Sequence, residues 1–144
     1  MKIESKKAFF DYEILERLEA GITLYGAEVK AIRLGHADLS GSFVRIIGSE
    51  AYLVNAKIFP YKYALPEGYD ERRTRKLLLH KNEIIALKSR IEGANLALVP
   101  LSIYTTKGFI KVQVGLGRGK KEYDKRAKIK KRDIQRSVEQ ELQS

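Results

Sequence analysis

The chain has 144 residues, no cysteine and a formal net charge of +10. This length fits one domain with a tail, and the absence of cysteine excludes disulfides and thiolate metal sites. Met1–Lys7 lacks the apolar core of a secretory signal, and the longest apolar stretch, Leu96–Leu101, is far shorter than the roughly 20 residues of a membrane-spanning helix. We therefore expect a cytoplasmic protein, whose positive charge would attract nucleic acid, anionic lipid or acidic proteins.

The positive charge is concentrated near the C-terminus. Arg118–Arg132 contains nine Lys or Arg and only two Asp or Glu residues. A weak apolar stripe through Tyr123, Ala127 and Ile134 cannot bury enough surface to offset about 1–2 kcal/mol of backbone ordering per residue. We therefore predict a folded body over residues 1–117 and a basic tail over residues 118–144. The tail is expected to be disordered when free and helical when it binds a polyanion.

Three segments of the N-terminal half have recognisable periodicity. Tyr12–Leu24 alternates imperfectly between apolar and polar residues, which favours a strand over a helix. Ala27–Leu34 has helical spacing and ends at a glycine, which predicts one short helix. Phe43–Ile47 and Tyr52–Ile58 are rich in aromatic and β-branched residues and are separated by a Gly-Ser-Glu turn, so they predict a hairpin.

The C-terminal half of the body continues in the same way. Leu77–Leu79 is a short apolar run, and Asn82–Ile91 has the spacing of a helix. Leu96–Thr106 and Phe109–Leu116 predict a second hairpin that turns at Lys107-Gly108.

About six strands with two to three helices indicate a mainly β fold. Short strands with intervening helices at this chain length are typical of a small antiparallel barrel, closed or partly open. A barrel of the oligonucleotide-binding type, with a basic C-terminal tail, is the interpretation we favour, although the pattern alone does not separate it from other small barrels.

Residue patterns for catalysis or metal binding are not found. His36 and His80 have no neighbours at metal-ligand spacing, and no serine-histidine arrangement stands out. The run Gly115–Lys121 resembles a phosphate-binding loop but has the wrong glycine spacing, and Lys121 stands where Ser or Thr is needed. We expect no catalytic residue, no metal, no cofactor and no enzymatic activity.

Cations and tyrosines gather in the middle of the chain. The predicted loop Pro60–Asp70 contains three tyrosines and precedes a dense cluster of positive charge. Guanidinium groups can bind phosphate with two hydrogen bonds, and aromatic rings can stack on unpaired bases. The same residues could equally cover the barrel and carry ordinary surface charge, and the sequence does not decide between these readings. The residues concerned are Tyr61, Tyr63 and Tyr69, followed by Arg72, Arg73, Arg75 and Lys76.

Four runs, in this order and spacing, resemble the small protein B (SmpB) family of transfer-messenger RNA-binding proteins. The likeness covers residues 6–136, nearly the whole chain. The runs are Gly26–Gly35, Arg73–His80, Leu98–Tyr104, and Gly115–Arg126 together with Ile129–Asp133.

The resemblance implies an oligonucleotide-binding barrel that holds the tRNA-like domain of transfer-messenger RNA. It also implies a tail that enters the decoding centre and the empty messenger channel of a stalled ribosome, contacting small-subunit rRNA. Elongation factor Tu and alanyl-tRNA synthetase would be indirect partners through the charged RNA. The protein would be a monomer without a membrane partner, and catalysis would belong to the ribosome and to these partners.

The resemblance also implies roles for individual positions in the body. Glu19 matches the acidic residue of a Glu-Ala-Gly strand end, and Leu78 matches the middle of a triple-leucine run; both are tied to RNA binding. We expect the role of Leu78 to be indirect, because such a leucine is more often in the core. Ser5 stands where an asparagine is usual and has a shorter reach. The predicted RNA-binding residues are Ser5, Lys6, Lys7, Glu19, Lys30, Arg33, Arg72, Arg73, Arg75, Lys76, Leu78 and His80.

The resemblance also implies roles for positions in the tail. Gly119 matches the family's connection between the body and the tail, and Asp124–Arg126 match a tail motif that the family needs after RNA binding, at accommodation on the ribosome. Tyr123 replaces a ring that is histidine in some members. The predicted ribosome-contacting residues are Gly119, Lys120, Lys121, Tyr123, Asp124, Lys125, Arg126, Lys128, Lys130, Lys131 and Arg132.

A general binder of ribosomal or single-stranded RNA on the same barrel is the alternative. It would show little preference for a folded tRNA-like elbow and would lose much of its affinity with the tail, because residues 118–144 carry half of the net charge.

Overall fold

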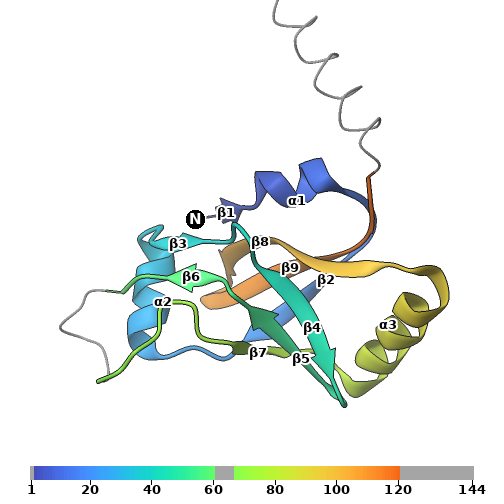
Figure 1. Cartoon of the computed structure of the whole chain (residues 1–144). Helices are drawn as coiled ribbons and strands as arrows, with labels where there is room; N and C mark the ends of the chain where they lie inside the picture. Colours follow the sequence, from blue (N-terminus) through green and yellow to red (C-terminus); the bar gives the residue numbers. More distant parts are fainter. Residues whose placement is uncertain (1, 61–66, 121–144) are drawn as a thin grey trace, which may run out of the picture.

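A computed structural model describes residues 2–60 and 67–120 (Figure 1). Seven strands form one antiparallel sheet in the order β1-β8-β9-β2-β7-β5-β4, and two short strands form a second sheet, β3-β6. Within the described residues, no helix is long and apolar enough to cross a membrane. The strands are β1 (Lys2–Glu4), β2 (Tyr12–Ile22), β3 (Ala37–Asp38), β4 (Phe43–Ile47), β5 (Glu50–Val54), β6 (Lys57–Ile58), β7 (Arg75–Leu78), β8 (Ala97–Thr106) and β9 (Phe109–Gly119); the helices are α1 (Lys6–Asp11), α2 (Gly26–Arg33) and α3 (Lys81–Ala94).

The large sheet curls around the core. Its edge strand β4 comes close to β8 (Figure 1), but no backbone ladder joins these two strands within the described ranges. The predicted mainly β, antiparallel fold is confirmed. The sheet is a curled, open one, so the ring of strands that a closed barrel requires is not completed.

Most predicted elements are present, with shifted ends. The predicted Tyr52–Ile58 strand divides into β5 and β6, because Asn55 adopts a positive φ of 66° and redirects the chain to the second sheet. Helix α3 continues through Gly93 and ends at Asn95, which has the left-handed conformation. Strand β9 extends to Gly119, so the predicted domain boundary after residue 117 falls inside a strand.

The core lies on the inner face of the curled sheet. Val112 and Val114 of β9 point inward and are fully buried, as their alternation predicted. They pack with Leu53 of β5, Leu77 of β7 and Ile32 of α2 in one apolar cluster. Each such side chain contributes about 1.5–3 kcal/mol by leaving water, so α2 is held against the sheet by its apolar face.

A buried carboxylate on the same face of α2 also attaches the helix to the rest of the fold. Glu28 lies fully buried, and its Oε2 accepts hydrogen bonds from Arg75 Nε at 2.8 Å and from the Tyr69 hydroxyl at 2.8 Å. Arg73 forms an ion pair with both carboxylate oxygens. We call Glu28, Tyr69, Arg73 and Arg75 the Glu28 cluster. It joins α2 to the segment that leads into β7.

Arg75 is the second buried charge of the Glu28 cluster. Its Nη1 donates to the carbonyl oxygens of Ala56 at 2.7 Å and Arg73 at 3.0 Å, and its Nη2 donates to that of Glu71 at 3.0 Å. The guanidinium therefore also ties β7 to the β5–β6 connection. A fully buried charge is tolerated only when it is paired and hydrogen-bonded in this way.

The pKa of Glu28 follows from the same contacts. Burial by itself would raise this pKa, but hydrogen bonds from Arg73, the Tyr25 backbone N–H, Tyr69 and Arg75 lower it below the ordinary value of 4.5. Burial raises the pKa of Tyr69 to about 12, and the bond to Glu28 and the carboxylate charge add to this rise. At neutral pH the carboxylate is ionised and the phenol is neutral.

Glu28→Gln should destabilise the fold by about 3–5 kcal/mol, because it leaves the buried Arg75 charge unpaired. Urea unfolding measures the change. Glu50→Gln is the matched control, since its ion pair with Lys76 is nearly half exposed and is worth less than about 1 kcal/mol. Equal, small effects of the two substitutions would contradict the role of the Glu28 cluster.

The lowered pKa of Glu28 also predicts an acid dependence. A carboxyl whose folded pKa is depressed contributes its full stability above its ordinary value of 4.5, and this contribution is lost as the pH falls through the folded pKa. The free energy of unfolding, measured by urea titration at a series of acidic pH values, should therefore fall more steeply in the unmodified protein than in Glu28→Gln. Parallel curves would contradict this prediction.

Candidate nucleic-acid interface

The outer face of β7, β2 and β9 carries a shallow groove of about 400 Å³. Gly21 of β2 pairs with Leu78 of β7 on one side and with Lys111 of β9 on the other. Side chains alternate along a strand, so the outward positions of three neighbouring strands meet here. The lining residues are Glu19, Gly21, Glu50, Lys76, Leu77, Leu78, Leu79, His80, Glu83 and Lys111.

Leu78 is an exposed leucine at the centre of the groove. It is 54% exposed, whereas its neighbour Leu77 is 1% exposed. A Cβ on Gly21 would lie only 3.1 Å from Leu78 Cβ, so the glycine leaves the space in which Leu78 lies across β2. The expectation of a core position for Leu78 is wrong: strand alternation places Leu77 in the core and leaves Leu78 available for direct contact.

Glu19 supplies a fixed acceptor beside this leucine. The hydroxyl of Tyr104, from β8, donates a hydrogen bond to Glu19 Oε2. Burial raises the pKa of Tyr104 to about 12, and the bond to Glu19 and its negative charge add to the rise, so the phenol remains a donor at physiological pH. A carboxylate held in this way can accept hydrogen bonds from base amino groups or from a ribose 2′-hydroxyl.

Charges of both signs line the groove. Lys76 Nζ lies 3.2 Å from Glu50 Oε2, and Lys111 Nζ lies 5.8 Å from the centre of the Phe109 ring. Glu83 adds a further carboxylate near the start of α3. This mixture suits recognition of particular groups on a folded RNA more than uniform attraction of phosphates.

The four cations that lie close together in the sequence have different surroundings in the structure. Lys76 points into the groove, and Arg72 is exposed, with its Nη1 3.2 Å from the Asn55 carbonyl oxygen. Arg73 pairs with Glu28. Arg75, predicted to bind RNA, is fully buried with its guanidinium engaged inside the Glu28 cluster, so we correct that assignment to a structural one.

Helix α2 and the start of α3 place three predicted residues at the surface. Lys30 and Arg33 are exposed in the last turn of α2, and Arg33 Nη2 donates to the Gly108 carbonyl oxygen at 3.3 Å. His80 is exposed at the edge of the groove, where its backbone N–H donates to Glu83.

None of the predicted residues Ser5, Lys6 and Lys7 lines this groove. Ser5 is buried, and its hydroxyl accepts a hydrogen bond from the Ala8 N–H at 3.3 Å as the N-cap of α1. The structure thus gives Ser5 a capping role, and its RNA contact stays a prediction. Lys6 and Lys7 are exposed on the six-residue helix α1, which the sequence analysis did not predict.

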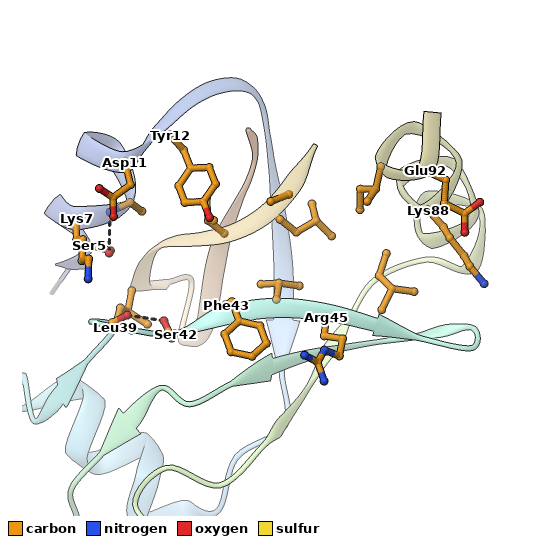
Figure 2. A pocket seen from close by; sticks show the side chains of 18 residues that line it. Ser5, Lys7, Asp11, Tyr12, Leu39, Ser42, Phe43, Arg45, Lys88 and Glu92 are labelled. Carbon is orange, nitrogen blue, oxygen red and sulfur yellow. Dashed lines mark hydrogen bonds between the residues drawn. The ribbon is translucent and has the colours of Figure 1, made fainter. Parts of the chain in front are cut away.

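A second hollow of about 590 Å³ follows the gap between β4 and β8. Figure 2 shows it bounded by α1, with Ser5, Lys7 and Asp11, by β4, with Phe43 and Arg45, and by α3. Its floor is apolar, and its rim mixes cations with carboxylates. Within the described part of the chain, no group of three His, Asp or Glu side chains could hold a metal ion.

The described chain ends just after β9. Gly119 pairs with Tyr12, and the backbone N–H of Lys120 donates to the Asp11 carbonyl oxygen at 2.8 Å. The side chain of Lys120 also donates to the Phe9 carbonyl oxygen at 3.1 Å. The other predicted tail residues, and Tyr61 and Tyr63, lie outside the described residues.

The sequence alone did not mark several residues of the groove and its surroundings, among them Lys111, Gly21 and Tyr104. Lys111 could have been found, because it lies between the inward-facing Ile110 and Val112 on a strand with clear alternation. Gly21 and Tyr104 could not, because their importance depends on which strands become neighbours.

Comparisons with known proteins agree with this picture. The family model described as SmpB protein matches residues 2–144. The SsrA-binding protein of Mesoplasma florum is 52% identical over 133 residues, which cover 92% of this chain and 89% of that protein. That of Thermus thermophilus is 48% identical over 139 residues, covering 96% of each. A solved structure described as "tmRNA-SmpB: a journey to the center of the bacterial ribosome" matches with a TM-score of 0.69 and 49% identity, covering 84% of this chain and 85% of that one.

The adjacent leucines of β7 provide a direct test of the outer face. Leu77→Ala should destabilise the protein by about 2–5 kcal/mol through the cavity that it leaves. Leu78→Ala should change stability by less than about 0.5 kcal/mol, because the side chain is exposed, while it weakens RNA binding. Urea unfolding and a binding titration measure the two effects. A large loss of stability in Leu78→Ala would contradict the assignment.

Proposed function

Because the chain belongs to the SmpB protein family, we propose that it is an RNA-binding adaptor for transfer-messenger RNA. It binds the tRNA-like domain of that RNA and delivers it to stalled ribosomes for trans-translation, in the cytoplasm. The proposal is supported by relatives that are SsrA-binding proteins and by the related tmRNA-SmpB structure. The observation that carries it is the outer-face groove, where exposed Leu78 lies beside the Glu19 acceptor and Lys111.

The groove recognises a folded RNA through complementary chemistry. Leu78 offers an apolar contact to a base or ribose, Glu19 accepts from exocyclic amines or a 2′-hydroxyl, and Lys111 neutralises a nearby phosphate. Exposed cations around the groove bind phosphates and release counterions from the RNA. This raises the affinity without selecting a sequence. Shape and a few base or ribose contacts would then distinguish the tRNA-like domain from other RNA.

The basic tail would act after the body has bound its RNA. Residues 118–144 carry half of the net charge, and an empty messenger channel lined by small-subunit rRNA is a suitable polyanionic site for them. The chain itself would act as a monomeric adaptor and not as an enzyme. Peptide transfer would belong to the ribosome, whereas elongation factor Tu and alanyl-tRNA synthetase would act on the RNA.

Binding at fixed physiological salt tests the proposed function. The full chain and a chain ending at Lys120, which retains all of β9, are compared on the tRNA-like domain, ordinary tRNA and an unstructured RNA of equal length. We expect a strong preference for the tRNA-like domain that persists without residues 121–144, because the body carries the groove. Equal binding to all three RNAs, lost with the tail, would instead indicate a general RNA-binding protein whose affinity is mostly counterion release.

A further inference from the structure

Tyr25 is an exposed aromatic residue at the N-terminus of α2. It is 51% exposed, although an aromatic ring usually gains free energy by burial. The guanidinium carbon of Arg73 lies over the ring, 4.3 Å from its centre. Among the described aromatic residues, this is the shortest of the cation–ring contacts that the structure shows.

The backbone of Tyr25 and the cation are both held by the same carboxylate. Glu28 Oε1 accepts a hydrogen bond from the backbone N–H of Tyr25 at 2.9 Å, and both carboxylate oxygens pair with Arg73. Glu28 is itself fixed by the buried Arg75. The pair therefore gives up little conformational freedom when a ligand arrives, which favours binding.

We infer that Tyr25 is a stacking platform for an unpaired RNA base. The guanidinium of Arg73 would pack on one face of the ring and the base on the opposite face. A cation on one face of a π system and a base on the other is an arrangement that RNA-binding proteins use at single-stranded loops, bulges and ends. A base inside a duplex cannot reach such a ring, so the ligand is a looped or splayed nucleotide.

The platform is continuous with the groove. The backbone N–H of Thr23, two residues before Tyr25, donates to the carbonyl oxygen of Lys76 at 3.0 Å, and Lys76 lines the groove. Two further exposed cations, Arg72 and Lys30, belong to the segment before β7 and to α2. The inference rests on the proposed function, because it assigns a second contact to the RNA that the groove binds.

Tryptophan fluorescence tests the platform directly, because the chain contains no tryptophan. Tyr25→Trp in the full chain should show strong quenching when the tRNA-like domain is added, since a stacked base quenches the indole. Phe43→Trp is the matched control: Phe43 is also partly exposed and has an arginine, Arg45, 5.2 Å from its ring centre, but it lies at the hollow between β4 and β8. Its fluorescence should change little.

Affinity measurements give a second readout. Tyr25→Ala should weaken binding by about 5- to 150-fold, the range expected for one base–aromatic stack, and Tyr25→Phe should retain the affinity. The dependence of affinity on salt should be unchanged in both variants, since neither removes a charge. Unfolding curves like that of the unmodified protein would show that Tyr25→Ala is folded.

The outcomes separate this inference from the proposed function. If the unmodified protein prefers the tRNA-like domain but Tyr25→Trp is not quenched and Tyr25→Ala binds normally, the platform is wrong and the proposed function stands. If the protein shows no preference among RNAs yet Tyr25→Trp is quenched by each of them, the platform stands and the proposed function is wrong.

Discussion

The buried carboxylate of Glu28 is the constraint on which the arrangement of this surface depends. An ionised carboxylate can remain in a protein interior only when cations and donors surround it, and here Arg73, Arg75 and Tyr69 do so. The same contacts attach α2 to β7 and to the connection between β5 and β6. The carboxylate of Glu28 also accepts a hydrogen bond from the backbone N–H of Tyr25 and so fixes the backbone there. One buried charge thus links the stability of the fold to the geometry of a surface that RNA would contact.

Strand alternation gives adjacent residues of β7 opposite roles. Arg75 and Leu77 point inward and are buried, whereas Lys76 and Leu78 point outward into the groove. The two cations look equivalent in sequence, and so do the two leucines. One of each pair therefore stabilises the fold, and the other lines the groove. Gly21 completes the division, because a Cβ at this position would lie 3.1 Å from Leu78 Cβ and would push the leucine side chain aside.

The sequence was sufficient to predict the parts that depend on local periodicity. The antiparallel hairpins, α2 and α3 all follow from spacing and turn residues, and together they gave the mainly β, antiparallel fold. Helix α1 escaped prediction because it has only six residues and one buried side chain, Ala8. The break at Asn55 was also missed, since a positive φ at a non-glycine residue leaves no reliable mark in the sequence.

The candidate site was less predictable than the fold. Arg75 looked like a surface cation because its partner, Glu28, lies 47 residues earlier in the chain, and no local pattern joins them. Tyr25 gave no signal for the same reason: Arg73 reaches it only through the tertiary fold. The capping role of Ser5 at α1 was also not predicted. The roles of Arg75 and Tyr25 depend on long-range contacts, which composition and spacing do not encode, whereas the cap at Ser5 is a local contact with Ala8.

The central claim is that RNA binds along the outer face from the groove to Tyr25. Amide chemical-shift mapping of the full chain by NMR, free and bound to the tRNA-like domain, tests it most directly. The account predicts the largest changes at Gly21, Leu78 and Lys111, continuing to Tyr25. Changes centred instead on Phe43 and Arg45, at the hollow between β4 and β8, with the outer face unaffected, would contradict it.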